Sequence, residues 1–274
     1  MKVAICFFGI TRSLTHTIGS IETNILSPAR ASAEVRIFAH FYRQTIIENP
    51  RSGENGSFNQ DEHKLLNADW LKLEDPDHCL EQHAFEELKT FGDSWNDDFR
   101  SLRNLVHQLH SIKEVTDAAM EWSPDLILFV RPDLAYHDSL GREIARASKS
   151  SEPAVILPNW QQWEGGYNDR FAICRGVSAA CVYGRRVTQM RDFCIETSSS
   201  LHSERLLRFG LEKNKIKPSF MSVRASRVRA TGELKQEQFA GPVTYALRQR
   251  IVRAIDFAGL RPFFTRLRSN TKAR

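Results

Sequence analysis

Five consecutive apolar residues, Leu126 to Val130, constrain the fold of this chain more than any other stretch. A strand without polar residues is buried on both faces, as in a parallel sheet that helices cover on each side. The run ends at Pro132, because proline fixes φ and has no N–H for the ladder. Arg131 and Asp133 are therefore expected just beyond the carboxyl end of a buried strand. Ligands bind at that edge of open α/β sheets.

Strand and helix patterns alternate along most of the chain, which predicts an α/β layered fold. Apolar residues recur at three- and four-residue spacing between residues 98 and 122, which predicts a long helix with one buried stripe. The polar, Gly- and Asn-rich range 49–63 is expected to be a loop. The other expected elements are strands at 1–8, 35–41, 70–74, 154–157 and 171–174, and helices at 15–26 (ending near Pro28), 184–198 and 204–214.

Composition favours a globular protein of the cytoplasm. The 274 residues are 41% hydrophobic and 26% charged, as in ordinary soluble domains. The five cysteines are odd in number and form no CxxC pair, which favours a reducing compartment and argues against a zinc site. The apolar N-terminal run is short and lacks a cleavage site, so it is interpreted as a strand rather than a signal peptide.

Positive charge is concentrated at the C-terminal end. Residues 245–274 contain eight lysines or arginines and one aspartate, hence a net charge of +7, whereas the whole chain carries +5. Apolar residues such as Ile251 and Phe263 alternate with these cations. We interpret residues 221–274 as a basic amphipathic helical tail that contacts an anionic membrane surface or a partner. A solvated chain end is the alternative, and no nucleic acid is expected, since no binding module precedes the tail.

Two turns at the expected sheet edge carry candidate ligand-binding residues. Asp133 is a carboxylate that can hold Mg²⁺ or Mn²⁺, or it simply pairs with Arg131 and caps the turn. After the first strand, Gly9 lets the backbone approach a ligand closely, and Arg12 can meet a phosphate. A plain tight turn is the other interpretation of Gly9.

A loop rich in aromatic residues is the candidate site for a sugar. It contains Trp160, Trp163, Tyr167, Asn168 and Asp169. Aromatic faces stack on the C–H faces of sugars, while acids and amides bond to the hydroxyl groups. The alternative is a surface loop with partly buried tryptophans.

Two further polar residues, Glu204 and His40, can each be explained by a structural role. Ser203 can cap a helix that Glu204 opens, and Glu204 then interacts with the positive helix end. A catalytic role for Glu204 stays open beside that explanation. His40, on the second predicted strand, is interpreted as a core histidine rather than a base.

The order of several short motifs resembles that of bacterial GT-A-like glycosyltransferases encoded in capsule and lipopolysaccharide loci. The resemblance covers about residues 1–220 and leaves out the tail. The motifs that carry it are Gly9-x-x-Arg12-Ser13, Phe38-x-His40-x-Tyr42, the helix with Gln108 to Lys113 that leads into Val130-Arg131-Pro132-Asp133-Leu134, Asn168 to Ile173, and Ser203 to Leu207.

The resemblance implies a GT-A-like (Rossmann-like) mixed, mostly parallel sheet flanked by helices over residues 1–220. Gly9, Arg12, Arg131 and Asp133 would bind the donor, and Asp169 would face the acceptor or act as base, with Glu204 second. GT-A enzymes commonly chelate Mn²⁺ or Mg²⁺ through an Asp-x-Asp. Here Arg131 replaces the first acid, so either Asp133 alone holds the metal or Arg131 neutralises the donor diphosphate.

The function so implied is transfer of a sugar from a nucleotide-sugar donor to a surface polysaccharide or lipid-linked glycan. The enzyme would be cytoplasmic and peripheral on the inner face of the membrane. Trp160, Trp163, Tyr167 and Asn168 would contact the acceptor. A non-catalytic glycan-binding or scaffold protein on a degenerate transferase fold is the first alternative. A sulfotransferase is the remote one, because its phosphosulfate loop would normally supply a lysine that is absent here.

Overall fold

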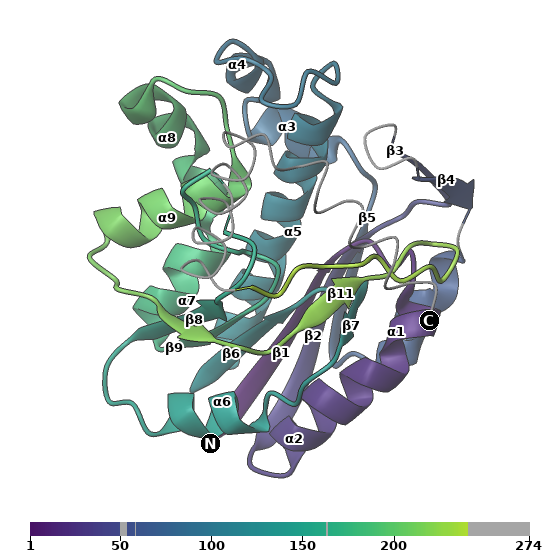
Figure 1. Cartoon of the computed structure of the whole chain (residues 1–274), viewed down its shortest axis with the longest axis vertical. Helices are drawn as coiled ribbons and strands as arrows, with labels where there is room; N and C mark the ends of the chain where they lie inside the picture. The colour runs from purple at the N-terminus through teal and green to yellow at the C-terminus, as the bar shows by residue number, and fades with distance from the viewer. Residues whose placement is uncertain (50–53, 58, 163, 241–274) are drawn as a thin grey trace, which may run out of the picture.

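A seven-stranded sheet forms the centre of the molecule (Figure 1). The computed structural model describes residues 1–49, 54–57, 59–162 and 164–240. Within these residues, the strand order is β10-β8-β9-β6-β1-β2-β5. The strands are β1 (Lys2–Gly9), β2 (Glu34–Tyr42), β5 (Trp70–Glu74), β6 (Leu126–Val130), β8 (Ala154–Pro158), β9 (Ala172–Arg175) and β10 (Ser219–Met221).

The sheet is mixed and mostly parallel. β1 pairs in parallel with β2 and with β6, β2 pairs in parallel with β5, and β8 with β10. β9 runs antiparallel to both of its neighbours, β6 and β8. The predicted class, an α/β fold with a mixed, mostly parallel sheet flanked by helices, is therefore confirmed. Because β9 is reversed, the residues that precede it lie at the carboxyl end of β6.

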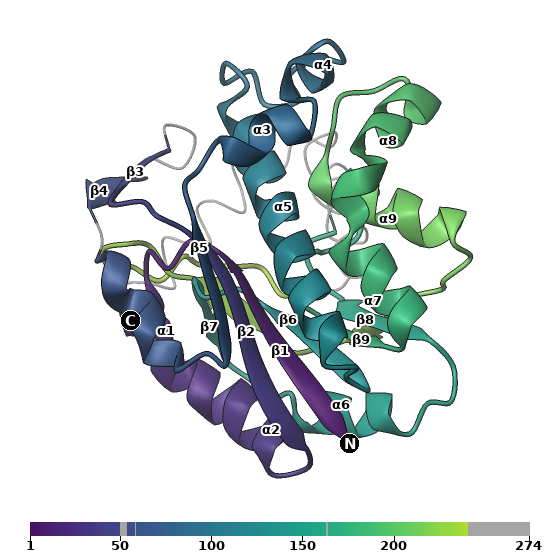
Figure 2. The same ribbon diagram turned by 180° about the vertical axis from the view of Figure 1, so that it is seen from behind.

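Helices cover both faces of the sheet (Figures 1 and 2). The helices α1 (Leu14–Ile21), α2 (Ser27–Arg30) and α6 (Gly141–Ser148) pack into one apolar cluster with the sheet. The long helix α5 (Arg100–Glu121), together with α7 (Val177–Gly184) and α9 (Ser203–Lys213), packs on the other face. A third cluster joins the N-terminal part of α5 to α3 (His78–Gln82), α4 (Phe85–Lys89) and α8 (Met190–Thr197).

The apolar run that becomes β6 is buried on both faces, as its sequence predicts. Leu126, Leu128 and Val130 belong to the cluster with α1 and α6. Ile127 and Phe129 belong to the cluster with α5 and α7 on the opposite face. The central strand thus joins the two halves of the core, and its carboxyl end is held in place from both sides.

Two predicted boundaries are wrong. The first helix does not stop near Pro28. The π-helical segment η1 (Glu22–Leu26) precedes that residue, and α2 continues to Arg30. The wider π turn changes the hydrogen-bond pattern just before a residue that has no N–H to donate. The predicted helix at 184–198 is split into the 3-10 helix η4 (Arg186–Gln189) and α8.

The range 49–63, predicted as a loop, contains regular structure. β4 (Glu54–Ser57) pairs antiparallel with β3 (Ile46–Asn49), and the 3-10 helix η3 (Gln60–Leu66) follows. Polar composition concealed this hairpin, because its strands have little apolar alternation. β4 also brings Glu54 within hydrogen-bond distance of Arg12, which follows β1.

The first part of the range predicted as a tail belongs to the α/β body. β11 (Ala225–Arg227) pairs antiparallel with β7 (Leu134–Tyr136), which follows Asp133. The basic stretch 245–274, with its predicted amphipathic helix, lies outside the described residues. Among the residues that are described, no helix is both long enough and apolar enough to span a membrane.

Substitution of Leu128 by alanine tests the central position of β6. Leu128 has 0% of its surface exposed, so the change leaves a cavity and should lower the unfolding free energy by about 2–5 kcal/mol. Leu71→Ala on β5 is the matched control, because Leu71 is 41% exposed. This substitution should change the unfolding free energy by less than about 0.5 kcal/mol. Urea unfolding followed by circular dichroism measures both. Equal losses in the two variants would contradict this description of the core.

Candidate functional site

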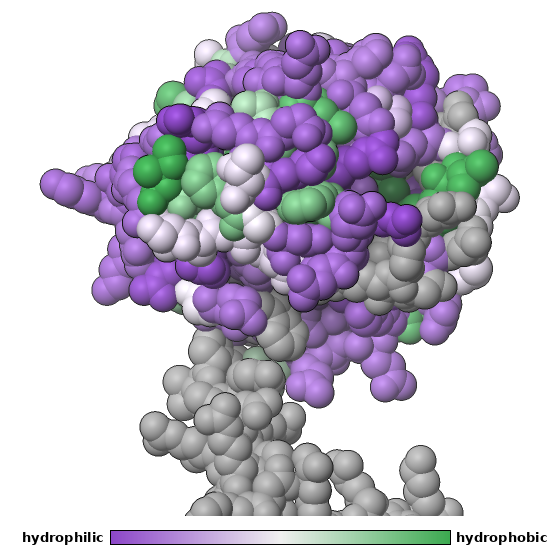
Figure 3. Space-filling view, turned by 90° about the horizontal axis from the view of Figure 1, so that it is seen from above, coloured by the Kyte–Doolittle hydropathy of each residue, from purple (hydrophilic) through white to green (hydrophobic). Residues whose placement is uncertain are grey.

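A pocket of about 270 Å³ lies at the carboxyl ends of β1 and β6. Figure 3 looks onto the upper end of the molecule, and the face shown is mainly hydrophilic. A neighbouring pocket shares Gln44, Ile46, Asn104 and His107 with the first and extends to Arg100 and Arg103. The two together offer room for an elongated ligand. The lining of the first pocket includes Phe8, Gly9, Arg12, Tyr42, Gln108, Arg131, Asp133 and Arg227.

Gly9 ends β1 and lines the pocket. Its φ is +101°, in the region that favours glycine, and a Cβ built there would meet nothing within 4 Å. Conformation rather than space therefore requires glycine at this position. The N–H of Gly9 donates to Ser111 Oγ at 2.8 Å, which fixes the end of β1 against α5.

A buried ion-pair network forms the floor of the pocket. Arg131 binds the Asp133 carboxylate with two parallel hydrogen bonds, Nε to Oδ1 at 2.8 Å and Nη2 to Oδ2 at 2.7 Å. Arg12 donates to the same Oδ2 at 2.6 Å and to Glu54 Oε2 at 3.1 Å. Burial alone would raise the pKa of Asp133, but the charges of Arg131 and Arg12 outweigh it and hold that pKa well below its usual range. Asp133 is thus an anion that positions two arginines.

The residues present do not fit a divalent ion at Asp133. Both of its oxygens accept hydrogen bonds from guanidinium groups. The nearby acid, Glu54, is likewise engaged by Arg12, by Arg229 at 2.8 Å and by the N–H of Ala230 at 3.0 Å. The predicted metal role of Asp133 is therefore replaced by the alternative, pairing with Arg131.

β11 brings a further arginine to the pocket that sequence reasoning missed. Arg227 lines the pocket, and its Nε donates to Glu237 Oε1 at 3.1 Å. Glu237 also pairs with the buried Arg170 at 3.3 Å. The predicted domain boundary at residue 220 would divide this site. Neither Glu54 nor Arg227 follows a buried strand of the main sheet, so no signal in the sequence placed them here.

Asp169 lies just before β9 and hence close to the carboxyl end of β6, so its charge acts on Arg131. Its Oδ2 accepts a hydrogen bond from the fully buried Arg186 at 3.2 Å and a short one from Ser203 Oγ. Ser203 is therefore a partner of Asp169. It does not cap α9 as predicted, since His202 occupies the cap position. Glu204, in the first turn of α9, is also buried.

The predicted acceptor residues divide into buried and half-buried ones. Trp160 has 0% exposure, and its Nε1 donates to the Val223 carbonyl at 2.8 Å. Asn168 is equally buried and donates from Nδ2 to the Trp160 carbonyl at 2.7 Å. Both hold the loop together and are not available to stack on a sugar, contrary to prediction. Tyr167 is half-buried and its ring lies 5.8 Å from that of Phe220, and Trp163 lies outside the described residues.

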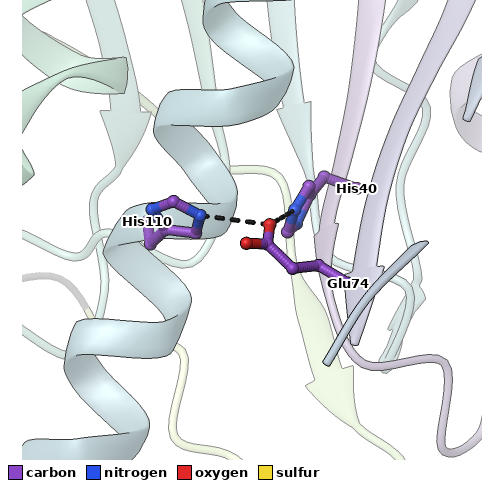
Figure 4. Close-up of side chains that lie close together, drawn as sticks. All are labelled: His40, Glu74 and His110. Atoms are coloured by element: carbon purple, nitrogen blue, oxygen red, sulfur yellow. Dashed lines mark hydrogen bonds and ion pairs between the residues drawn. The ribbon is translucent and has the colours of Figure 1, made fainter. Parts of the chain in front are cut away.

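A second polar cluster lies beside the pocket and joins His40, Glu74 and His110 (Figure 4). Glu74 Oε2 is 2.8 Å from His40 Nε2 and 3.2 Å from His110 Nε2. Burial lowers the pKa of His40 to about 4, against the effect of Glu74. Burial raises the pKa of Glu74, but hydrogen bonds from the two histidines outweigh this and bring it to about 2. His40 is thus a buried, bonded histidine, as predicted.

Comparison with known proteins does not identify a family. No protein-family model matches the chain, and no curated protein matches its sequence. Among solved structures, the crystal structure of mouse Xyloside xylosyltransferase 1 in its apo form is similar over 81% of this chain and 84% of that chain, with 11% sequence identity and a TM-score of 0.39. A likeness at this TM-score carries no weight, and the fold class stands on the strand order and pairing.

Replacing Asp133 by asparagine tests whether the carboxylate holds the arginine pair. The substitution removes a buried charge from Arg131 and Arg12, which should cost about 3–5 kcal/mol of unfolding free energy. Asp138→Asn is the matched control, because Asp138 pairs with Arg224 at the surface and should matter much less. Urea unfolding of both variants gives the comparison. A loss for Asp133→Asn no greater than for Asp138→Asn would refute the proposed role of this carboxylate.

Proposed function

We propose that this chain is a glycosyltransferase that moves a sugar from a nucleotide-sugar donor to a surface polysaccharide or lipid-linked glycan. The observation that carries the proposal is the convergence of Arg12, Arg131 and Arg227 on one pocket at the carboxyl edge of the sheet. Guanidinium groups bind phosphate oxygens in forked geometry. The sequence resemblance to GT-A-like glycosyltransferases and the mixed, mostly parallel sheet support the same conclusion.

The donor diphosphate binds to arginines rather than to a metal ion in this proposal. Asp133 and Glu54 hold Arg12, Arg131 and Arg229 in fixed positions, so the cations need little reorganisation when phosphate arrives. Gly9 allows the diphosphate to approach the backbone at the end of β1.

The reaction needs a base and a stabilised leaving group. The acceptor hydroxyl attacks the anomeric carbon while a carboxylate takes its proton, and the bond from that carbon to the diphosphate breaks. Asp169 is the proposed base, acting through Oδ1, because the bonds from Arg186 and Ser203 both go to Oδ2. The arginines stabilise the negative charge that develops on the departing diphosphate. Glu204 is the second candidate for the base.

The acceptor is proposed to enter from the side of Tyr167, next to Asp169. Residues 164–167 pass over the start of α9, where a Cβ on Gly166 would lie 2.2 Å from the carbonyl carbon of Glu204. That close approach keeps the loop beside Asp169. We further propose that the enzyme works on the cytoplasmic side of the membrane and that the basic stretch 245–274 contacts anionic lipid.

A non-catalytic binding protein on the same fold is the second candidate, and one observation favours it. Asp133, in the place of a transferase metal ligand, is fully engaged by arginines. Calorimetry with several nucleotide-sugars, with and without Mn²⁺, separates the two candidates. An absence of binding under both conditions would argue against a transferase.

Arg227→Gln should weaken binding of nucleoside diphosphates by about 10- to 100-fold, since a charge-assisted hydrogen bond contributes about 1.5–3 kcal/mol. Isothermal titration of UDP, GDP and TDP in the presence of EDTA measures this. The matched control is Arg224→Gln, three residues earlier, because Arg224 is exposed and pairs with Asp138 outside the pocket. Binding that requires Mn²⁺, or equal loss in both variants, would overturn the arginine-based site.

Asp169→Asn should reduce sugar transfer by about 100- to 10,000-fold, the usual contribution of a general base. Donor affinity should change far less than turnover, because Asp169 does not line the donor pocket and acts there only through its charge on Arg131. Glu204→Gln, made in parallel, shows whether the second carboxylate is the base instead. Near-normal turnover of Asp169→Asn with the fold intact would remove Asp169 from the mechanism.

A further inference from the structure

Three potential metal ligands from separate elements converge beside the donor pocket. His40 comes from β2, Glu74 from the end of β5, and His110 from the middle of α5 (Figure 4). Their ligand atoms all lie within 4.8 Å of one another. Among the described residues, no other group of three or more histidine, cysteine, aspartate or glutamate side chains is as close together. We propose that these residues bind a first-row divalent ion of the Zn²⁺ class, which clamps β2 and β5 to α5.

The spacing and chemistry of the three ligands suit such an ion. Two imidazole nitrogens and one carboxylate oxygen form a ligand set typical of zinc, with bonds of about 2.0–2.2 Å. Ligand atoms around a tetrahedral ion are then a little over 3 Å apart. Glu74 Oε2 is 2.8 Å from His40 Nε2 and 3.2 Å from His110 Nε2, so small side-chain rotations admit the ion. Three ligands leave a fourth position for water.

The second nitrogen of each imidazole has a partner that can orient it. His40 Nδ1 lies 2.9 Å from Ser111 Oγ, whose hydroxyl donates to the His40 carbonyl at 2.9 Å. His110 Nδ1 lies 2.9 Å from His83 Nε2. Metal-bound histidines usually donate their other N–H to such a group. An ion at the two Nε2 atoms would require the neutral tautomers with the proton on Nδ1, in which His40 Nδ1 donates to Ser111 Oγ and His110 Nδ1 donates to His83 Nε2.

The surroundings supply charge balance and an entry path. Lys72 Nζ is 3.2 Å from Glu74 Oε2 but 2.8 Å from Glu114 Oε2, so it can remain paired with Glu114 when a cation takes Glu74. His40 and His110 are buried, whereas the Glu74 side chain is 19% exposed. The ion would therefore enter past Glu74.

The clamp would act on the donor pocket through the elements that it joins. Tyr42 follows His40 by two residues on β2, and His107 precedes His110 by almost one turn on α5. Both line the pocket, and Tyr42 donates to the His107 carbonyl at 2.8 Å. An ion at His40, Glu74 and His110 would hold these two walls at a fixed separation. The ion is thus separate from the arginines that are proposed to bind the donor phosphates.

Metal titration of the full chain, freed of any affinity tag and stripped with a chelator, tests the proposal. Co²⁺ should give a ligand-field absorption band, Zn²⁺ should abolish it at one equivalent, and Zn²⁺ should raise the melting temperature. Glu74→Gln and His110→Gln should each lose more than about 100-fold in Zn²⁺ affinity, and His83→Gln about 10- to 100-fold. His16→Gln, at an exposed histidine of α1, should bind as the unaltered protein does.

The proposal is overturned if the unaltered protein binds no Co²⁺ or Zn²⁺, a result that does not depend on the folding of any variant. It is also overturned if Glu74→Gln, with an unchanged circular dichroism spectrum, binds as tightly as His16→Gln. The separate titration with UDP in EDTA reports on the arginine pocket. Failure of the metal site and failure of donor binding are therefore distinguishable.

Discussion

One buried carboxylate, Asp133, forms ion pairs with two arginines, and these ion pairs determine how the rest of the site is arranged. Arg12 follows β1 and Arg131 follows β6, so the carboxylate ties the ends of two adjacent central strands. Two guanidinium groups this close would repel each other without an anion between them. Glu54 extends the network to β4 and to Arg229 beyond β11. Segments distant in sequence thus share one set of charges, which fixes the shape of the pocket.

The network also leaves this edge of the sheet positively charged, as the proposed binding of a diphosphate without a metal ion requires. Three arginines, Arg12, Arg131 and Arg229, share two carboxylates, Asp133 and Glu54, which leaves a net charge of +1. Arg227 and Arg170 share Glu237 and leave another positive charge. The residual charge is fixed in a partly buried setting, where electrostatic interactions are stronger than in water.

Much of the fold follows from local patterns, whereas the site follows only in part. The apolar run of β6 and the stripe of α5 predict their elements, because each pattern reports burial directly. Arg131 and Asp133 were expected at this edge because residues after buried parallel strands meet there. Gly9 and Arg12 were singled out from a turn and from the family resemblance, and all four residues line the pocket. Glu54 and Arg227 were missed, since they lie on short strands outside the main sheet. Trp160 was predicted to contact a sugar because its loop is rich in aromatic residues, but its side chain is buried and the Asn168 amide donates to its carbonyl.

The pairing of β11 with β7 has a consequence for how Arg227 is held. Ala225 on β11 is buried in the apolar cluster with α1 and α6. Just after the strand, the N–H of Val228 donates to the Asp133 carbonyl at 2.9 Å. The backbone that carries Arg227 is therefore fixed both to the core and to the residue that positions Arg12 and Arg131. The three arginines of the pocket keep their relative positions unless part of the core opens with them.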